Sequence, residues 1–261
     1  MNSYKTVSII GSGNLAFHLS KAIINSTTYK LQGIFGRTEA RVKRLADQVG
    51  CEFDMLDEPY QFASDLVILC VSDDAIKEVL DVNQFPEETL VIHIAGSVPL
   101  SIFEAHDVQN GGVFYPLQTF SKTREIDFSD VPIFIEAQQL ESLQELQALA
   151  FDIGGTYREL DSDKRLQLHL AAVFASNFTN SLMVGAESLL KDIGLEFRVL
   201  YPLLIEVVEK SARIGPVAAQ TGPAKRSDLE TLKKHEESLK NEEMRQLYRL
   251  MSDLIRRQSN E

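Results

Sequence analysis

The stretch that decides the fold is Thr6-Val7-Ser8-Ile9-Ile10-Gly11-Ser12-Gly13-Asn14-Leu15-Ala16. Its first five residues form a mostly apolar run, which predicts a strand buried in a parallel sheet. A helical spacing follows over residues 14–25. The turn between them has the pattern G-x-G-x-x-A, in which backbone amides at a helix N-terminus bind the phosphates of a dinucleotide.

Each of the three small residues of that pattern has a physical reason. Gly11 permits the tight turn, Gly13 lets a pyrophosphate approach the backbone, and Ala16 allows the helix to pack closely on the strand. A tight turn with chance glycines is the alternative, but the strand and the helix stand where the pattern requires them. We therefore expect the whole turn to bind the cofactor, namely Gly11, Ser12, Gly13, Asn14, Leu15 and Ala16.

Strand-like and helical segments alternate along the first half of the chain. This alternation predicts a doubly wound, mostly parallel sheet of the α/β class. We expect strands at residues 6–10, 31–35, 66–71, 90–95, 112–115, 132–136 and 156–159, and helices at residues 14–25, 38–49, 74–81 and 138–151. The later part reads as helix at residues 162–191, 196–213, 227–239 and 241–257. The sequence thus predicts a dinucleotide-binding domain over residues 1–155 and an all-α domain over residues 156–261.

Composition narrows the possible partners. The 261 residues carry a formal charge of −12, which argues against nucleic acid and against an anionic membrane surface. Only two cysteines are present, too few for a disulfide framework or a metal cluster, and they favour a reducing cytoplasm. Residues 1–136 hold 10 Lys and Arg against 19 Asp and Glu. An anion bound there needs backbone amides and a few local cations.

The residues after the second strand decide which cofactor fits. An Asp or Glu at that point would bind the ribose 2′-hydroxyl of NAD, but the chain has Gly36-Arg37-Thr38. Arg37 offers a planar set of donors to a 2′-phosphate, and Thr38 adds a hydroxyl, so we expect NADP. The alternative is a solvated Arg37 and a Thr38 that only caps the next helix. We expect the backbone of Val71 and Ser72 to line the nicotinamide side.

Candidate substrate contacts follow other strand ends, which open on the same crevice. His93 and Ser97 follow one strand, and Gln118 and Thr119 lie in a loop after another. His93 as a buried structural imidazole is an equal alternative, and Ser97 as a helix cap before Pro99 is another. Thr221, in a polar loop between two later helices, is a further candidate.

The helix over residues 168–180 is apolar nearly all round, which predicts that it is buried. Its polar residues His169, Ser176, Asn177 and Asn180 have offsets of 0, 7, 8 and 11, which place them along one face. Buried polar groups need partners, so this stripe faces a ligand or another helix. We expect His169, Asn177 and Asn180 to be catalytic.

Taken together, these segments resemble the bacterial Rossmann-like family whose C-terminal part is the domain DUF2520, described as NADP- or F420-dependent oxidoreductases. The chain is more distantly similar to pyrroline-5-carboxylate reductase and to 6-phosphogluconate dehydrogenase-like proteins. The resemblance implies a helical domain that closes the substrate cleft and forms a homodimer. Hydroxyacid dehydrogenases of that superfamily carry a catalytic Lys followed four residues later by Asn. This chain has His169 and Val173 instead, so the lysine mechanism does not carry over.

The sequence therefore predicts an NADP(H)-dependent oxidoreductase for a small imine or keto substrate bound between the two domains, with no metal. Imidazole as a class of side chain titrates near neutrality, so we expect His169 to act as the general acid. A non-catalytic NADP-binding sensor or scaffold is one alternative. An F420-dependent reductase is another, although Arg37 and Thr38 suit a 2′-phosphate better.

Overall fold

The structure is a computed structural model, and it describes residues 4–258. The chain divides into two compact units, Met1–Ser176 and Asn177–Glu261. The first unit contains the sheet together with the first long helix after it, so it extends beyond the 155/156 boundary expected from the pattern change.

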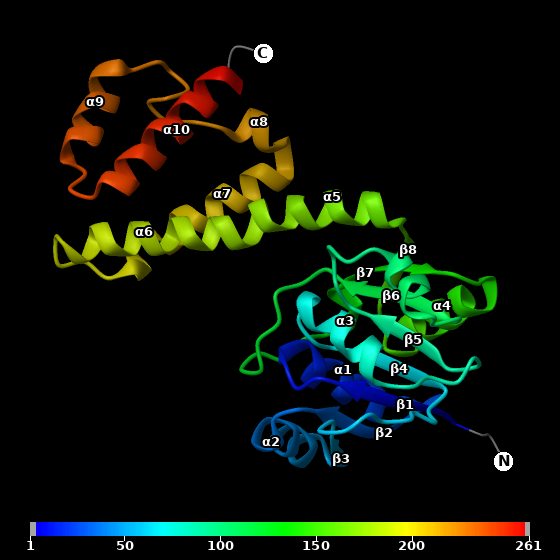
Figure 1. Ribbon diagram of the computed structural model, residues 1–261. Helices are drawn as coiled ribbons and strands as arrows, with labels where there is room; N and C mark the ends of the chain where they lie inside the picture. The colour runs from blue at the N-terminus through cyan, green and yellow to red at the C-terminus, as the bar shows by residue number, and fades with distance from the viewer. Residues whose placement is uncertain (1–3, 259–261) are drawn as a thin grey trace. The chain divides into compact units, whose positions relative to one another are not determined.

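The first unit is built on an eight-stranded sheet with the order β3-β2-β1-β4-β5-β6-β7-β8 (Figure 1). All neighbouring strands are parallel except β6 and β7, which are antiparallel. The α/β doubly wound prediction is thereby confirmed. The strands are β1 (Lys5–Ile10), β2 (Tyr29–Gly36), β3 (Glu52–Met55), β4 (Leu66–Leu69), β5 (Leu90–His93), β6 (Gly111–Pro116), β7 (Pro132–Ala137) and β8 (Thr156–Glu159).

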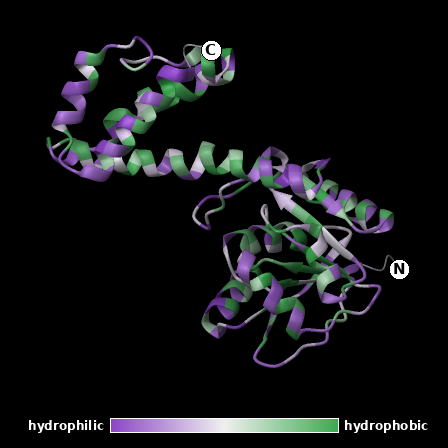
Figure 2. Ribbon diagram, turned by 45° about the horizontal axis from the view of Figure 1, so that its top comes forward, coloured by the Kyte–Doolittle hydropathy of each residue, from purple (hydrophilic) through white to green (hydrophobic). Residues whose placement is uncertain are grey.

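Helices cover both faces of this sheet. On one face α1 (Asn14–Ile24), α2 (Glu39–Val49) and α4 (Leu140–Asp152) bury residues against a single apolar cluster. On the other face α3 (Asp73–Val82) and two short 3₁₀ turns contribute to a second cluster. The strands at the centre of the sheet are green in Figure 2, because both of their faces are apolar, whereas the helices alternate green and purple.

Two elements differ from the sequence expectation. Strand β3 was not predicted, because Glu52–Met55 alternates polar and apolar residues and pairs only along one edge, with β2. The helix expected from Pro99 is instead a pair of 3₁₀ turns, η1 (Leu100–Ile102) and η2 (Glu104–His106). Asp107 then adopts a left-handed conformation (φ 56°), which ends the second turn.

The long helix expected over residues 162–191 consists of three segments. These are α5 (Ser162–Val173), the π-helical segment η4 (Phe174–Phe178) and α6 (Thr179–Lys191). The i→i+5 bonding of a π-helix departs from the α-helical period. The offsets that placed His169, Asn177 and Asn180 on one face therefore do not apply across η4. The prediction of a single polar stripe along one helix face is wrong.

The second unit is all helical. After α6 come η5 (Phe197–Leu200), α7 (Tyr201–Ile214), α8 (Pro216–Ala219), α9 (Leu229–Ser238) and α10 (Glu242–Gln258). Many large apolar side chains of this unit are exposed in the single chain; Phe178, for example, is 49% exposed. Phe174, in the first unit, is 61% exposed. The expectation that residues 168–180 are buried is thus wrong for the single chain.

Residues 4–258 contain neither a membrane-spanning helix nor a metal-binding cluster. None of the described helices is long and apolar enough to cross a membrane. Within the same residues, no group of three or more His, Cys, Asp or Glu side chains is placed to hold a metal ion. Cys51 and Cys70 are both free thiols.

Candidate cofactor site and histidine pair

The glycine-rich turn has the geometry that its sequence predicts. Gly11 follows β1 with φ of +121°, and a Cβ on it would lie 2.2 Å from the carbonyl oxygen of Cys70. The amide of Gly11 donates to the carbonyl of Phe35 (2.8 Å), which ties the turn to β2. Only glycine fits here, because a side chain would meet both the unfavourable φ and the neighbouring backbone.

The N-terminus of α1 is open to a ligand. Gly13 is the N-cap residue, and no side chain caps the helix there. A Cβ built on Gly13 would meet nothing within 4 Å, and the first turn of α1 carries no acidic residue. The first amides of a helix lack partners within the helix and carry the positive end of its dipole. This turn therefore fits a pyrophosphate.

A cavity of about 380 Å³ begins at this turn and runs over the carboxyl ends of β1, β2 and β4. It brings together seven of the ten residues predicted to bind the cofactor, namely Gly11, Ser12, Gly13, Arg37, Thr38, Val71 and Ser72. Three predicted residues do not line it. Ala16 is buried in the core, where it permits close packing of α1 on the sheet, Leu15 packs against the same core, and Asn14 donates to the carbonyl of Phe120 (2.8 Å).

Two charged residues of this cavity were missed from the sequence. Arg41, in the first turn of α2, lines the cavity beside Arg37. Glu78, on α3, accepts from Nη1 of Arg37 through both carboxylate oxygens, at 2.6 Å and 2.7 Å. The segment Gly36-Arg37-Thr38 holds no carboxylate, but Glu78 brings one to Arg37 from α3. Thr38 is the N-cap residue of α2, but its side chain makes no capping bond.

A further cation lies at the glycine-rich turn. Lys122, from the loop after β6, donates through Nζ to the carbonyl of Ser12 (3.1 Å). Burial lowers the pKa of Lys122, and the positive charge of Arg44 adds to that effect. Gln118 and Thr119, the two residues of this loop predicted to bind substrate, are exposed, and Gln118 accepts from the amide of Thr119 (2.9 Å).

His169 forms a pair with Tyr115 at the carboxyl end of β6. The phenolic oxygen of Tyr115 lies 3.0 Å from Nδ1 of His169, and the two rings meet edge to face with their centroids 5.9 Å apart. Gly96, just after β5, packs against the imidazole so closely that a Cβ on it would lie 2.5 Å from Nδ1. His169 was predicted from the sequence as a site residue, whereas its partner Tyr115 was not.

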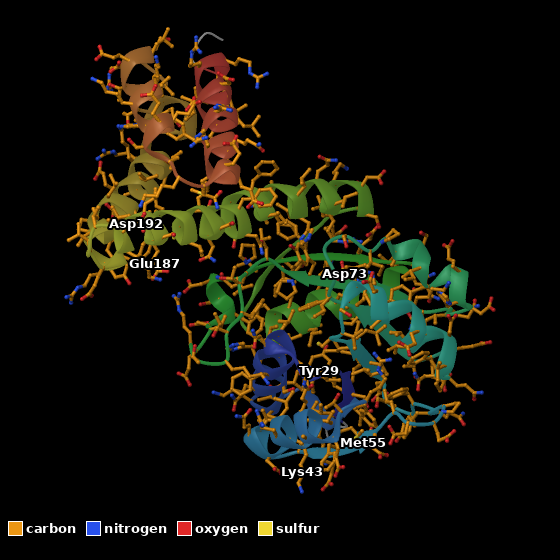
Figure 3. All side chains as sticks on the ribbon, turned by 60° about the vertical axis from the view of Figure 1, so that its left-hand side comes forward. Tyr29, Lys43, Met55, Asp73, Glu187 and Asp192 are labelled. Atoms are coloured by element: carbon orange, nitrogen blue, oxygen red, sulfur yellow. The ribbon has the colours of Figure 1, made fainter. Side chains whose placement is uncertain are left out.

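Polar groups surround this pair. Ser97 donates to the carboxylate of Asp73, the first residue of α3, which is labelled in Figure 3. Four residues before His169 on α5, Arg165 is 1% exposed and forms an ion pair with Glu136. The other arm of Arg165 donates to the carbonyl of Val98 (2.6 Å). This buried pair fixes α5 to β7 and to the loop that carries Gly96 and Ser97.

His93 is a core residue. Its side chain is fully buried, it stacks on Phe103 with centroids 5.5 Å apart, and its Nδ1 accepts from the amide of Ala95 (3.2 Å). Burial, reinforced by the charge of Arg165, lowers the pKa of His93 to about 3. Of the two sequence interpretations, the structure favours the buried structural imidazole, which corrects the substrate-binding one.

Three remaining candidates belong to the second unit. Asn177 and Asn180 are exposed on η4 and α6. Thr221 is exposed in the loop after α8, where its carbonyl accepts from Gln220 (2.9 Å). Their roles in substrate binding and catalysis stay predictions.

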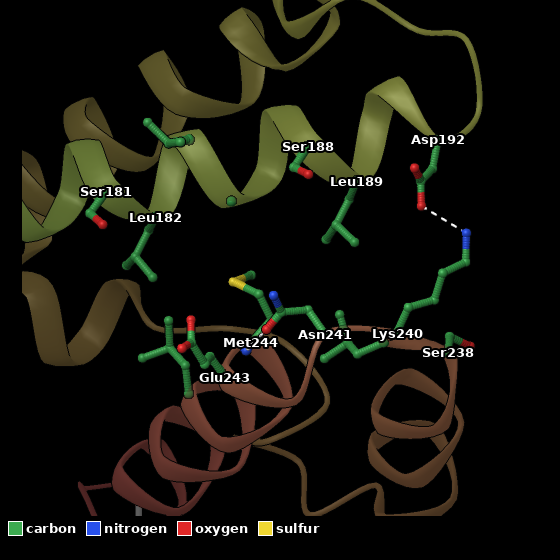
Figure 4. A pocket seen from close by; sticks show the side chains of 14 residues that line it. Ser181, Leu182, Ser188, Leu189, Asp192, Ser238, Lys240, Asn241, Glu243 and Met244 are labelled. Carbon is green, nitrogen blue, oxygen red and sulfur yellow. Dashed lines mark hydrogen bonds and ion pairs between the residues drawn. The ribbon is translucent and has the colours of Figure 1, made fainter.

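The second unit has a cavity of its own, of about 450 Å³, between α6 and α10 (Figure 4). Leucines such as Leu182 and Leu189 line it, and an ion pair between Asp192 and Lys240 (3.0 Å) closes one side. Met244 fills the space over Gly185, where a Cβ would lie 2.9 Å from its Cε atom. None of the predicted site residues lines this cavity, so the site at the sheet edge is the better candidate.

Two family models match parts of this chain. Residues 6–96 match a family model described as "NADP oxidoreductase coenzyme F420-dependent". Residues 131–255 match a model described as a domain of unknown function, DUF2520. A comparison with curated proteins finds no match.

Among solved structures, a Bacteroides fragilis protein to which NADP oxidoreductase activity is ascribed is 37% identical, with a TM-score of 0.86. The alignment covers 97% of this chain and 98% of that one. The 1-pyrroline-5-carboxylate reductase of Streptococcus pyogenes is 15% identical, with a TM-score of 0.62 over 97% and 98% of the two chains. A reductive aminase from Aspergillus terreus, solved with NADPH, is 15% identical, with a TM-score of 0.69 over 98% and 93%. For the last two proteins the likeness concerns the fold alone.

Proposed function

The chain belongs to the DUF2520 family of Rossmann-type proteins, and from this membership we propose that it is an NADP(H)-dependent oxidoreductase that reduces a small C=N or C=O compound. One observation carries the cofactor part of the proposal. The cavity at the carboxyl ends of β1, β2 and β4 joins an uncapped helix N-terminus to two arginines, Arg37 and Arg41.

The two ends of that cavity match the two phosphate groups of NADP. The glycine turn and α1 offer amides to the pyrophosphate, and Lys122 adds a positive charge beside Ser12. Arg37, Thr38 and Arg41 offer guanidinium and hydroxyl donors to a 2′-phosphate. This concentration of cations supports an anionic cofactor in a chain whose net charge is −12.

NADPH, when bound, supplies the hydride that reduces the carbon of the C=N or C=O bond. His169 is the candidate for the accompanying proton transfer, from Nε2 to the substrate nitrogen or oxygen. Its Nδ1 faces Tyr115, so Nε2 is the ring nitrogen left to meet a substrate. We assign Asn177 and Asn180 to hydrogen bonding of the substrate and keep Ser97 and Thr221 as further candidate contacts.

We also propose that two copies pair through the helical part of the chain. Large apolar side chains such as Phe178, Leu203 and Val208 are 49%, 59% and 68% exposed in the single chain. Soluble monomers seldom expose large contiguous apolar surfaces. Sedimentation equilibrium at micromolar concentration tests this proposal, and a strictly monomeric species contradicts it.

Titration of the purified protein with NADPH and with NADH, followed by nicotinamide fluorescence, tests the cofactor. We expect tighter binding of NADPH. We expect Arg37→Ala to weaken NADPH binding about tenfold or more and to leave NADH binding nearly unchanged, because a charge-assisted contact to the 2′-phosphate is lost. Lys43→Ala is the matched control, since it removes an equal charge from α2 at a residue outside the cavity.

The other outcomes have distinct meanings. Equal affinity for both nucleotides would refute the role of Arg37 in cofactor choice. Binding of neither nucleotide, together with binding of coenzyme F420, would replace NADP with the alternative that the family model for residues 6–96 suggests.

A turnover screen of imines and keto acids with NADPH tests the chemistry. We expect His169→Ala to lose turnover while it keeps NADPH binding, because His169 lies outside the cofactor cavity. Turnover that persists in His169→Ala removes this residue from the mechanism. NADPH binding without turnover on any substrate, combined with nucleotide-dependent assembly, would favour the sensor or scaffold alternative.

A further inference from the structure

The imidazole of His169 has two ring nitrogens, and its neutral form carries a proton on only one of them. Which nitrogen holds it decides whether His169 can donate to a substrate from Nε2 or can only accept there. The hydrogen bond made by the other nitrogen sets this choice. In this protein that bond joins Nδ1 of His169 to the phenol of Tyr115, at 3.0 Å.

The surroundings of Tyr115 favour the phenol as the donor. Its side chain is 9% exposed, and burial together with the negative charge of Asp73 raises its pKa, which keeps the phenolic proton in place. Within residues 4–258, the bond to His169 is the only hydrogen bond of the Tyr115 hydroxyl. If Nδ1 carried the proton instead, the phenolic proton would have no acceptor among those residues. Buried polar groups in folded proteins nearly always have partners.

The position of the imidazole is also fixed. Gly96 packs on the ring at Nδ1, so the ring cannot move toward the β5 end. Arg165, one turn earlier on α5, is held by Glu136 and by the carbonyl of Val98. Val98 lies two residues after Gly96. The bond from Arg165 to the carbonyl of Val98 therefore links α5 to the loop whose Gly96 packs on the imidazole.

We propose that Tyr115 donates its phenolic proton to Nδ1 of His169 and so holds the neutral imidazole with its proton on Nε2. Tyr115 is then a positioning residue, which acts through His169 and makes Nε2 a hydrogen-bond donor toward the substrate. The catalytic meaning of this inference rests on the proposed function, in which Nε2 of His169 gives its proton to the substrate. The phenolic proton of Tyr115 then moves to Nδ1, so that the imidazole stays neutral, and solvent returns a proton to Tyr115. The tautomer itself is a property of the protein without any ligand.

The test reads the tautomer directly. The full chain is labelled with ¹⁵N, and two-bond ¹H–¹⁵N correlation spectra are recorded without nucleotide at a pH where free imidazole is neutral. His169→Gln identifies the signals of this residue among those of the five histidines. We expect the wild type to show one tautomer, with Nδ1 unprotonated and Nε2 protonated. We expect Tyr115→Phe to show a mixture of both tautomers, because the donor to Nδ1 is gone.

Tyr157→Phe is the matched control. It removes a hydroxyl from an exposed tyrosine on β8 and should leave the tautomer unchanged. A wild type with its proton on Nδ1 overturns the inference. So does a Tyr115→Phe protein that keeps the pure Nε2–H form while its circular dichroism spectrum and melting temperature show that it is folded.

A second measurement separates this inference from the proposed function. We expect Tyr115→Phe to lower kcat with the best substrate of the screen by about tenfold, with unchanged NADPH affinity and little change in KM. An unchanged kcat overturns the positioning role even if the tautomer shifts. A wild type that fails to bind NADPH refutes the cofactor assignment, but the tautomer spectra still decide whether Tyr115 controls His169.

Discussion

Nη1 of Arg37 lies 2.6 Å and 2.7 Å from the two carboxylate oxygens of Glu78, inside the cavity that leads from the glycine turn of β1. The pair joins the end of β2 to α3, and both side chains are more than half exposed. An exposed ion pair of this kind contributes little to stability. The same guanidinium is the group proposed to bind the 2′-phosphate, so Glu78 competes with that phosphate for Arg37.

We expect Glu78→Gln to bind NADPH about two- to fivefold more tightly, since Arg37 is released and a repulsive carboxylate is removed. NADH lacks the 2′-phosphate, and its affinity should not improve. Parallel fluorescence titrations of the variant with both nucleotides measure the difference. If Glu78→Gln instead weakens NADH and leaves NADPH unchanged, then Glu78 binds the ribose hydroxyl and the cofactor preference is reversed.

Alanine at Gly11 should lower the stability of the protein, whereas alanine at Gly13 should lower its affinity for the nucleotide. Gly11→Ala places a Cβ 2.2 Å from the carbonyl of Cys70 at φ of +121°, and we expect it to lower the free energy of unfolding by about 2 kcal/mol or more. Gly13→Ala meets no protein atom within 4 Å and has an extended backbone, so stability should be preserved. Its methyl group would stand where the pyrophosphate approaches, and NADPH affinity should fall about tenfold or more.

Urea unfolding and nucleotide titration of both variants check this pair. If Gly13→Ala binds NADPH as tightly as the wild type does, the glycine turn is not part of the cofactor site. Equal stability of Gly11→Ala and the wild type would mean that the turn can relax away from Cys70.

Lys122 should act on the part of the cofactor that NADPH and NADH share. Its Nζ lies 3.1 Å from the carbonyl of Ser12, so we expect Lys122→Met to weaken both nucleotides by a similar factor, about three- to tenfold. Lys21→Met is the control, because Lys21 also lies over the ring of Phe17 but pairs with Glu125. A loss of affinity confined to NADPH would mean that Lys122 interacts with the 2′-phosphate and not with the pyrophosphate.

The sequence was most informative where one short segment determines its own conformation. The run from Thr6 to Ala16 specifies a buried strand, a glycine turn and a helix start, and all three occur as predicted. Arg37 could be placed at the cavity because it directly follows β2. These features depend on local pattern and on the rule that parallel strands end at one edge.

Features that depend on distant residues could not be found in this way. Glu78 reaches Arg37 from another helix, and Tyr115 reaches His169 across 54 positions of the chain. No spacing rule relates such pairs. The role of His93 could not be decided from the sequence. A histidine at the end of a strand gives the same sequence pattern whether its ring packs in the core or faces a ligand. The π-helical segment at Phe174–Phe178 also cannot be detected from a hydrophobic pattern based on 3.6 residues per turn.

The burial of His93 has a measurable consequence for stability at mild acid pH. Its pKa is lowered to about 3 in the folded protein, mainly by burial, whereas an unfolded chain binds the proton near pH 6.5. Between these values the unfolded state binds more protons, so acidification favours unfolding. The contribution of a neutral His93 is complete above about pH 6.5 and is lost as the pH falls toward 3. We expect protonation of this group alone to lower the free energy of unfolding by about 2 kcal/mol between pH 7 and pH 5.

His93→Asn separates this effect from the general response to acid. Asparagine does not titrate, and its side-chain oxygen can accept from the amide of Ala95 as Nδ1 of His93 does. Urea unfolding at pH 7 and at pH 5 should therefore show a smaller loss of stability in the variant than in the wild type, whatever their stabilities at pH 7. Equal losses in the two proteins would mean that His93 takes up its proton in the folded state, either because water reaches the ring or because it turns out of the core.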